Sequence, residues 1–208
     1  MKSSSGKKGM FLFVYILVGL VLSGILTISL YGRCSDCFVS MRGILVVGIV
    51  VASLLGFFIS KASNMILKVI GYLISIVAFS IFVLVFFPIF ASGDLLDAYK
   101  IFYGAAIAGE LILFAGTAIV RGKRFYMGII SLLCIVVYVM IFGMSMDSGV
   151  KAVISMIVML AYLFISTIFY YDSENEDYME MLERSGMIFN VVAFFISMYG
   201  RYTGSWKR

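Results

Sequence analysis

Long apolar runs separated by short polar segments dominate this chain. A spanning helix needs roughly 20 apolar residues, and six of the runs approach that length. In chain order the runs are Met10–Tyr31, Gly43–Ser60, Val69–Ala91, Ile101–Val120, Phe125–Met144, Ala152–Tyr171 and a shorter last one, Met187–Thr203. The pattern predicts an all-α fold, a polytopic transmembrane helical bundle with six spans in residues 10–171.

The last run is ambiguous. Its clean apolar part, Met187–Gly200, falls in the short range typical of interfacial or re-entrant helices, and it contains Asn190. The longer stretch Ser185–Trp206 just suffices to span. Residues 187–208 are therefore predicted to form a C-terminal membrane helix, either spanning or interfacial, with a basic tail.

The lysines and arginines predict the orientation. Residues 1–9 carry three lysines, and placing them in the cytoplasm puts most other basic residues of the short loops there too. The first run then acts as a retained signal anchor. The basic C-terminal residues fit this rule only if the last run does not cross. A cytoplasmic N-terminus in a bacterial inner membrane is the resulting prediction.

Composition supports the membrane assignment and limits the chemistry. The chain is 63% hydrophobic and 13% charged, whereas soluble domains are about half apolar and a quarter charged. The net charge of +5 is explained by topology, so the lipid bilayer and other membrane subunits are the expected partners and nucleic acid is not. Histidine is absent, and no nucleotide-binding or hydrolase motif occurs. We therefore expect no metal, no cofactor and no catalytic residues.

Two polar residues fall inside apolar runs. Glu110 lies near the middle of Ile101–Val120, and Asn190 lies in the last run. A carboxylate at mid-membrane costs about 2.5–3.5 kcal/mol on insertion scales and marks a functional site by default. Three roles remain open for Glu110: a hydrogen bond that only fixes packing, an ion or proton site, and contact with another subunit.

Small residues surround Glu110. They are Gly104, Ala105, Ala108, Gly109 and Gly116. Stripes of small residues let membrane helices approach closely. This helix is therefore predicted to be central to the bundle or to contact another subunit, with Glu110 buried.

A cysteine pair, Cys34-Ser-Asp-Cys37, follows the first run and precedes Arg42. We expect it in the first outer loop. A C-x-x-C spacing is typical of redox sites, although a local disulfide or two idle thiols explain it equally simply.

The stretch Met10–Ser60 resembles the start of the bacterial disulfide-forming quinone reductases, which carry a C-x-x-C and a nearby arginine after their first helix. The resemblance implies that Cys34 and Cys37 are a redox pair and that Arg42 serves a quinone. That family needs a second cysteine pair in the next outer loop, and Ser92–Lys100 has none. Since the electron relay cannot run without it, we do not assign the chain to the family.

Residues 172–186 form an acidic segment, predicted to be a cytoplasmic connector. It is either a solvated link or a docking strip for a basic partner. Its acidic residues are Glu174, Glu176, Asp177, Glu180 and Glu183, with Asp172 at the start.

Three functional hypotheses follow. The first is a non-enzymatic multi-pass subunit of a larger membrane assembly (of the secretion, conjugation, exclusion, immunity or accessory-subunit kind) that acts through helix contacts. The second is a small transporter or channel that uses Glu110. The third is a membrane thiol oxidoreductase that uses Cys34 and Cys37.

Overall fold

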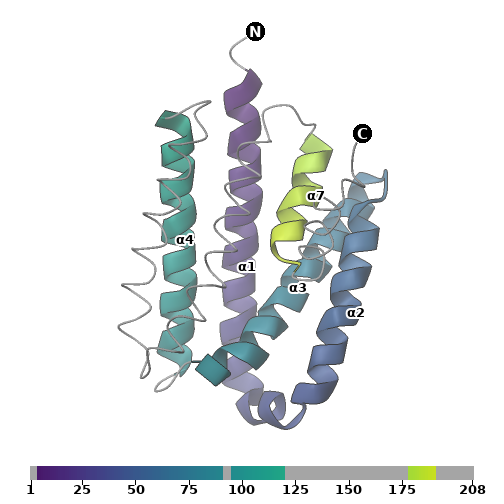
Figure 1. Cartoon of the computed structure of the whole chain (residues 1–208), viewed down its shortest axis with the longest axis vertical. Helices are drawn as coiled ribbons and strands as arrows, with labels where there is room; N and C mark the ends of the chain where they lie inside the picture. Colours follow the sequence, from purple (N-terminus) through teal and green to yellow (C-terminus); the bar gives the residue numbers. More distant parts are fainter. Residues whose placement is uncertain (1–3, 91–94, 120–177, 191–208) are drawn as a thin grey trace, which may run out of the picture.

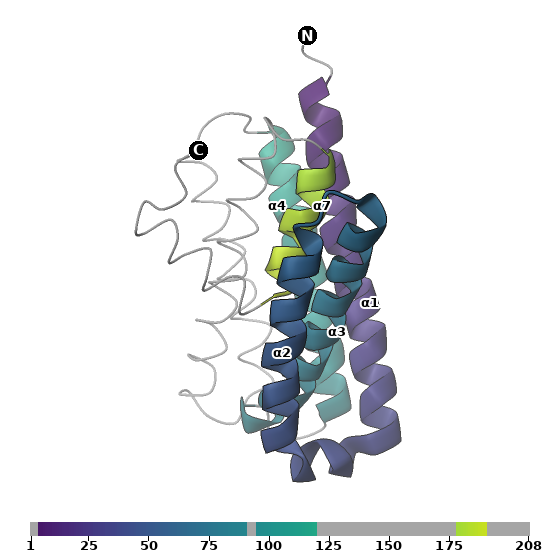
Figure 2. The same cartoon turned by 90° about the vertical axis from the view of Figure 1, so that its right-hand side faces the viewer.

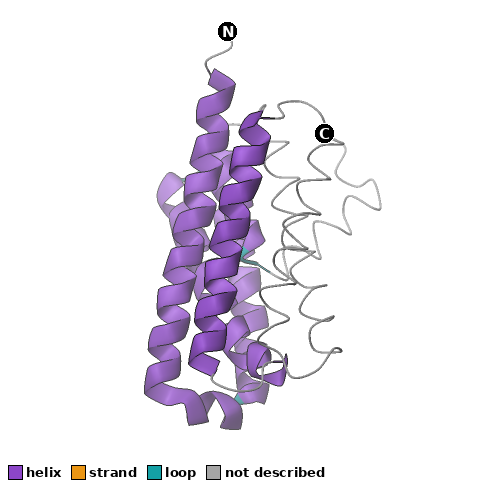
Figure 3. Cartoon of the chain, turned by 90° about the vertical axis from the view of Figure 1, so that its left-hand side faces the viewer, coloured by secondary structure: helices purple, strands orange, loops and turns teal. Residues whose placement is uncertain are grey.

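The computed structural model describes residues 4–90, 95–119 and 178–190, and this part of the chain is helical apart from short turns (Figure 3). Its helices are α1 (Ser4–Ser40), α2 (Arg42–Ser60), α3 (Met65–Phe90), α4 (Leu95–Ile119) and α7 (Tyr178–Ile188). Within the described residues, three stretches are long and apolar enough to cross a membrane: Met10–Arg33, Arg42–Ser60 and Met65–Val85. The chain is thus an all-helical integral membrane protein over these ranges. The predicted runs Phe125–Met144 and Ala152–Tyr171 lie outside them.

The helix bounds follow the apolar runs with two differences. First, α1 continues to Ser40 and α2 begins at Arg42, so the segment that we expected to be an outer loop is helical and the chain turns at Met41. Second, α7 crosses the boundary that the sequence suggested between an acidic connector and the last run, because its apolar residues Met181 and Leu182 are buried in the bundle. The acidic residues of this segment had suggested a solvated link or a docking strip and not a buried helix.

The long helices run roughly side by side along the length of the molecule (Figures 1 and 2). Figure 1 shows α1 in the centre with α4 on one side and the α2–α3 hairpin on the other. The helix α3 is tilted relative to α1: the two lie apart at the N-terminal end of the molecule and approach each other toward the middle of both helices. The short α7 lies between α1 and the hairpin at that N-terminal end, and it contacts α1, α2 and α3.

The α2–α3 hairpin is held by backbone contact between helices. Asn64 caps α3, since its side-chain Oδ1 accepts a hydrogen bond of 2.8 Å from the Ile66 amide. Along the hairpin, Gly71 faces the backbone of α2: a Cβ built there would lie 2.6 Å from Ser60 N and 2.8 Å from Gly56 O. Such contact between glycines is a common way for membrane helices to pack without large side chains.

The buried core joins α1, α3, α4 and α7. Its apolar side chains come from all four helices and include Leu12, Ile16 and Leu20, Ile76, Tyr99 and Phe102, and Met181 and Phe189. By contrast α2 exposes most of its outer face, with Ile44 75% exposed and Phe58 66% exposed. In a bilayer such a face contacts lipid, which carries no penalty for apolar groups.

Candidate functional site

A cluster of four hydroxyl groups joins α1, α3 and α4 inside the bundle. We call Ser23, Thr27, Ser80 and Tyr103 the hydroxyl cluster. Tyr103 Oη lies 2.8 Å from Ser23 Oγ and 2.8 Å from Thr27 Oγ1, and Ser23 Oγ lies 2.9 Å from Ser80 Oγ. All four residues are buried. Scattered serines and threonines on separate helices are thus brought to one place.

The protons of the hydroxyl cluster can be assigned by counting donors. Each hydroxyl has one hydrogen to donate. Ser80 Oγ donates to the Ile76 carbonyl at 2.8 Å, so Ser23 donates to Ser80. Tyr103 must then donate to Ser23, and Thr27 to Tyr103. The chain ends on a backbone carbonyl with every hydroxyl satisfied, an arrangement that fixes helix packing.

Glu110 lies on the face of α4 that packs into the bundle, and it is fully buried, as the sequence predicts. Two contacts bracket its position. Tyr103 bonds Ser23 on one side, and on the other Phe114 stacks on Phe13 with ring centroids 4.3 Å apart. Glu110 therefore faces the stretch of α1 between these contacts, in the interior of the span Met10–Arg33. A carboxyl group there is shielded from both lipid and bulk water.

Asn190 ties the end of α7 to the α2–α3 hairpin. Its amide Nδ2 donates to the Ser53 carbonyl at 2.6 Å and approaches Ser75 Oγ at 3.4 Å. Ser75 lies at the middle of the candidate span Met65–Val85, and Ser53 lies close to the middle of Arg42–Ser60. The helix α7 thus ends at Ile188 about halfway along two candidate spans. Residues beyond Asn190 are outside the described part.

The small residues of α4 do not all share one face. Gly109 is buried, whereas Gly104 and Ala108 are exposed, and a Cβ on Gly104 would meet nothing within 4 Å. The side chain of Ala105 and the surroundings of Gly116 lie outside the described residues. The packed face of α4 is instead formed mainly by larger residues, Tyr99, Phe102, Tyr103 and Glu110, together with Ala106.

Sequence reasoning missed the glycines that make the closest helix contacts. Besides Gly71, these include Gly19, where an added Cβ would lie 2.5 Å from Phe189 Cζ and 2.7 Å from Tyr72 Oη. Both glycines lie inside apolar runs. A glycine at a helix position with no turn to explain it was the signal that could have found them.

The cysteine pair lies on the last turns of α1, three residues apart on one helix. The side chains of Cys34 and Cys37 are outside what the structure describes, and Arg42 is the first residue of α2, half-buried. The C-terminal end of a helix carries partial negative charge, which disfavours a thiolate. This placement is the reverse of a reactive cysteine at a helix N-terminus.

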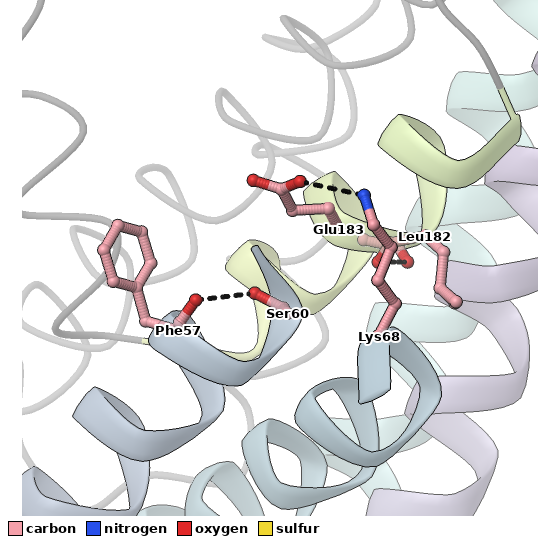
Figure 4. Close-up of polar contacts among 6 residues, drawn as sticks. Phe57, Ser60, Lys68, Leu182 and Glu183 are labelled. Carbon is pink, nitrogen blue, oxygen red and sulfur yellow. Dashed lines mark hydrogen bonds and ion pairs between the residues drawn. The ribbon is translucent and has the colours of Figure 1, made fainter. Parts of the chain in front are cut away.

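The structure describes two acidic residues of the segment 172–186, Glu180 and Glu183. Glu174, Glu176 and Asp177 lie outside the described residues, and Glu180 is exposed on α7. Glu183 forms an ion pair with Lys68 of α3, with Nζ and Oε2 3.3 Å apart, and the Lys68 side chain is 9% exposed (Figure 4). Glu183 is therefore engaged in an ion pair within the chain and does not face a partner protein as a free charge.

Residues 4–90, 95–119 and 178–190 contain no group of three or more histidine, cysteine, aspartate or glutamate side chains able to hold a metal. Comparisons with protein-family models, with curated proteins and with solved structures found no match to this chain. The site must therefore be interpreted from its own geometry.

Proposed function

We propose that this protein is a small transporter or channel in which Glu110 carries a proton or a small cation through the bundle. The observation that carries the proposal is the complete burial of Glu110 inside the helices rather than against lipid. Charged residues within membrane segments usually face the bundle interior and mark ion pathways. The hydroxyl cluster is too far from Glu110 to bind the same ion. Tyr103 lies seven residues before Glu110, which is about 10 Å along the helix.

The end of α7 supports the same function. Many secondary transporters bind substrate near the membrane midplane, where helices are interrupted. Here α7 ends beside Asn190, at the level of the middle of two candidate spans. A helix that ends at mid-depth and a buried carboxyl group within one bundle are features that a purely structural subunit does not need.

Glu110→Gln tests the proposal directly. The purified protein is reconstituted in liposomes loaded with a dye that responds to protons, sodium or potassium, and a gradient of the corresponding ion is imposed. The variant should abolish the flux seen with the original chain, because glutamine keeps the side chain's shape but cannot ionise. Asp97→Asn is the matched control: Asp97 lies on the same helix, is exposed, and pairs only locally with Lys100 at 2.7 Å.

The control variant should keep full flux. Unchanged flux in Glu110→Gln, or no flux of any of these ions through the original chain, would contradict a transport function. Size-exclusion chromatography in detergent establishes that each variant remains folded.

The proposed topology has six spans, a seventh C-terminal membrane helix and a cytoplasmic N-terminus, in a bacterial inner membrane. In this topology Cys34 and Cys37 face the outside. A membrane-impermeant maleimide added to intact cells should label Cys34 after reduction, and a cysteine placed at Ser5 should label only after the membrane is opened. Labelling of Cys34 only from the cytoplasmic side would show that the orientation is reversed.

A second function has its own support. The face of α4 turned away from α1 exposes Gly104 and Ala108 together with Leu111 and Ile112, which are 48% and 43% exposed. A small-residue face of this kind suits another membrane helix. The alternative is therefore a non-enzymatic subunit of a membrane assembly, and it predicts that Ala108→Leu disrupts an oligomer seen by cross-linking.

A further inference from the structure

The helices α1 and α3 form a V that α7 fills. Near the middle of both helices they are joined through the hydroxyl cluster, by the bond between Ser23 and Ser80. Toward the N-terminal end α3 tilts away from α1, and the long side chain of Tyr72 reaches across to α1, where its hydroxyl donates to the Tyr15 carbonyl. The helix α7 occupies the space between them (Figure 1).

The inner tip of α7 is fitted to this space. Phe189 packs over Gly19 of α1, and its ring lies edge-on to Tyr72 and Phe79 of α3, with centroids 6.1 Å and 5.6 Å away. Asn190 then bonds the hairpin at mid-depth. These contacts close the V at the level of the middle of the spans.

A charge pair joins the middle of α7 to α3. Lys68 and Glu183 come from α3 and α7, and their side chains are 9% and 19% exposed (Figure 4). A pair this shielded is weakened little by salt, and removing one partner leaves the other charge in a poorly solvated place. The attachment of α7 therefore depends strongly on this pair.

We propose that α7 is a displaceable wedge that closes the interior of the bundle from its N-terminal end, with the Lys68–Glu183 ion pair as its latch. Opening the latch lets the wedge withdraw and admits water to the middle of the bundle near Ser53. Control of ion access to Glu110 by this movement rests on the proposed transport function. The movement of α7 itself does not depend on that function.

Thiol labelling tests the wedge in the full chain. Cys34, Cys37 and Cys134 are first replaced by serine, and Ser53→Cys then places a single thiol beneath Asn190. Its rate of reaction with an impermeant maleimide, added to membranes open on both sides, is measured with the latch intact, in Lys68→Glu, in Glu183→Lys, and in the double variant that exchanges the charges. Thr27→Cys is the matched control, buried in the hydroxyl cluster away from α7.

Each single charge reversal should raise the labelling rate of Ser53→Cys about tenfold or more, the change in open population that about 1.4 kcal/mol produces. The exchanged pair should restore slow labelling, and the control thiol should stay slow throughout. Unchanged labelling in the single variants would overturn the latch. An equal rise at the control thiol would also overturn it, because the whole bundle would then be loosening. Neither result depends on whether the protein transports an ion.

Discussion

Gly71→Ala should lower the free energy of unfolding by up to about 2 kcal/mol, because overpacking a close contact costs about 1–3 kcal/mol and alanine's better helix propensity offsets part of it. The new methyl group would lie within 3 Å of three backbone atoms of α2: Ser60 N, Gly56 O and Ser60 Cα. Backbone cannot rotate aside as a side chain does, so α2 and α3 must move apart. The loss outweighs the roughly 1 kcal/mol that alanine gains over glycine in a helix.

Unfolding of the purified protein by denaturant in detergent micelles, followed by circular dichroism, measures this effect. Gly48→Ala is the matched control, because a Cβ there meets nothing within 4 Å. The control should be neutral or slightly stabilising. Equal stabilities for Gly71→Ala and Gly48→Ala would mean that the hairpin is not packed through its glycines.

Gly19→Ala should also destabilise the protein, by about 1–3 kcal/mol, and a second substitution should relieve it. The added methyl group meets the ends of two side chains, the ring of Phe189 and the hydroxyl of Tyr72, rather than backbone. Phe189→Leu removes the ring edge and makes room. The double variant should therefore be more stable than the sum of the two single effects predicts, by about 0.5–3 kcal/mol.

The same unfolding measurement on the four proteins of this cycle gives the coupling energy. Gly32→Ala on the same helix is the control, since a Cβ there meets nothing within 4 Å. Additive effects would indicate that the tip of α7 does not rest on Gly19. A large effect of the control would indicate instead a general sensitivity of α1.

The sequence predicted where helices lie better than which faces they bury. Apolar length placed α2 correctly to its last residue, Ser60, because a span is defined by its composition. It could not show which face of α4 packs, since both the buried Phe102 and the exposed Leu111 and Ile112 are apolar. In a membrane the usual contrast between polar outside and apolar inside is missing, so the sequence left open whether small residues such as Gly104 face the bundle or another subunit.

Polar residues inside apolar runs were the informative signals. Glu110 was expected to be buried and is, because a carboxyl group has no favourable place against lipid. The bond from Asn190 to Ser53 could not be foreseen, since it joins segments 137 residues apart. The burial of α7 was not predicted, because its acidic residues suggested a solvated segment. Met181 and Leu182 of this helix are nevertheless buried.

The position of α7 in the chain has a consequence for biosynthesis. Lys68 and Ser75 are each separated by 115 residues from the groups on α7 that they meet, Glu183 and Asn190. During translation α1, α2 and α3 therefore enter the membrane well before the segment that fills the V between them exists. The first three helices reach their final packing only after residues 178–190 have been made, so a segment synthesised much later completes their assembly.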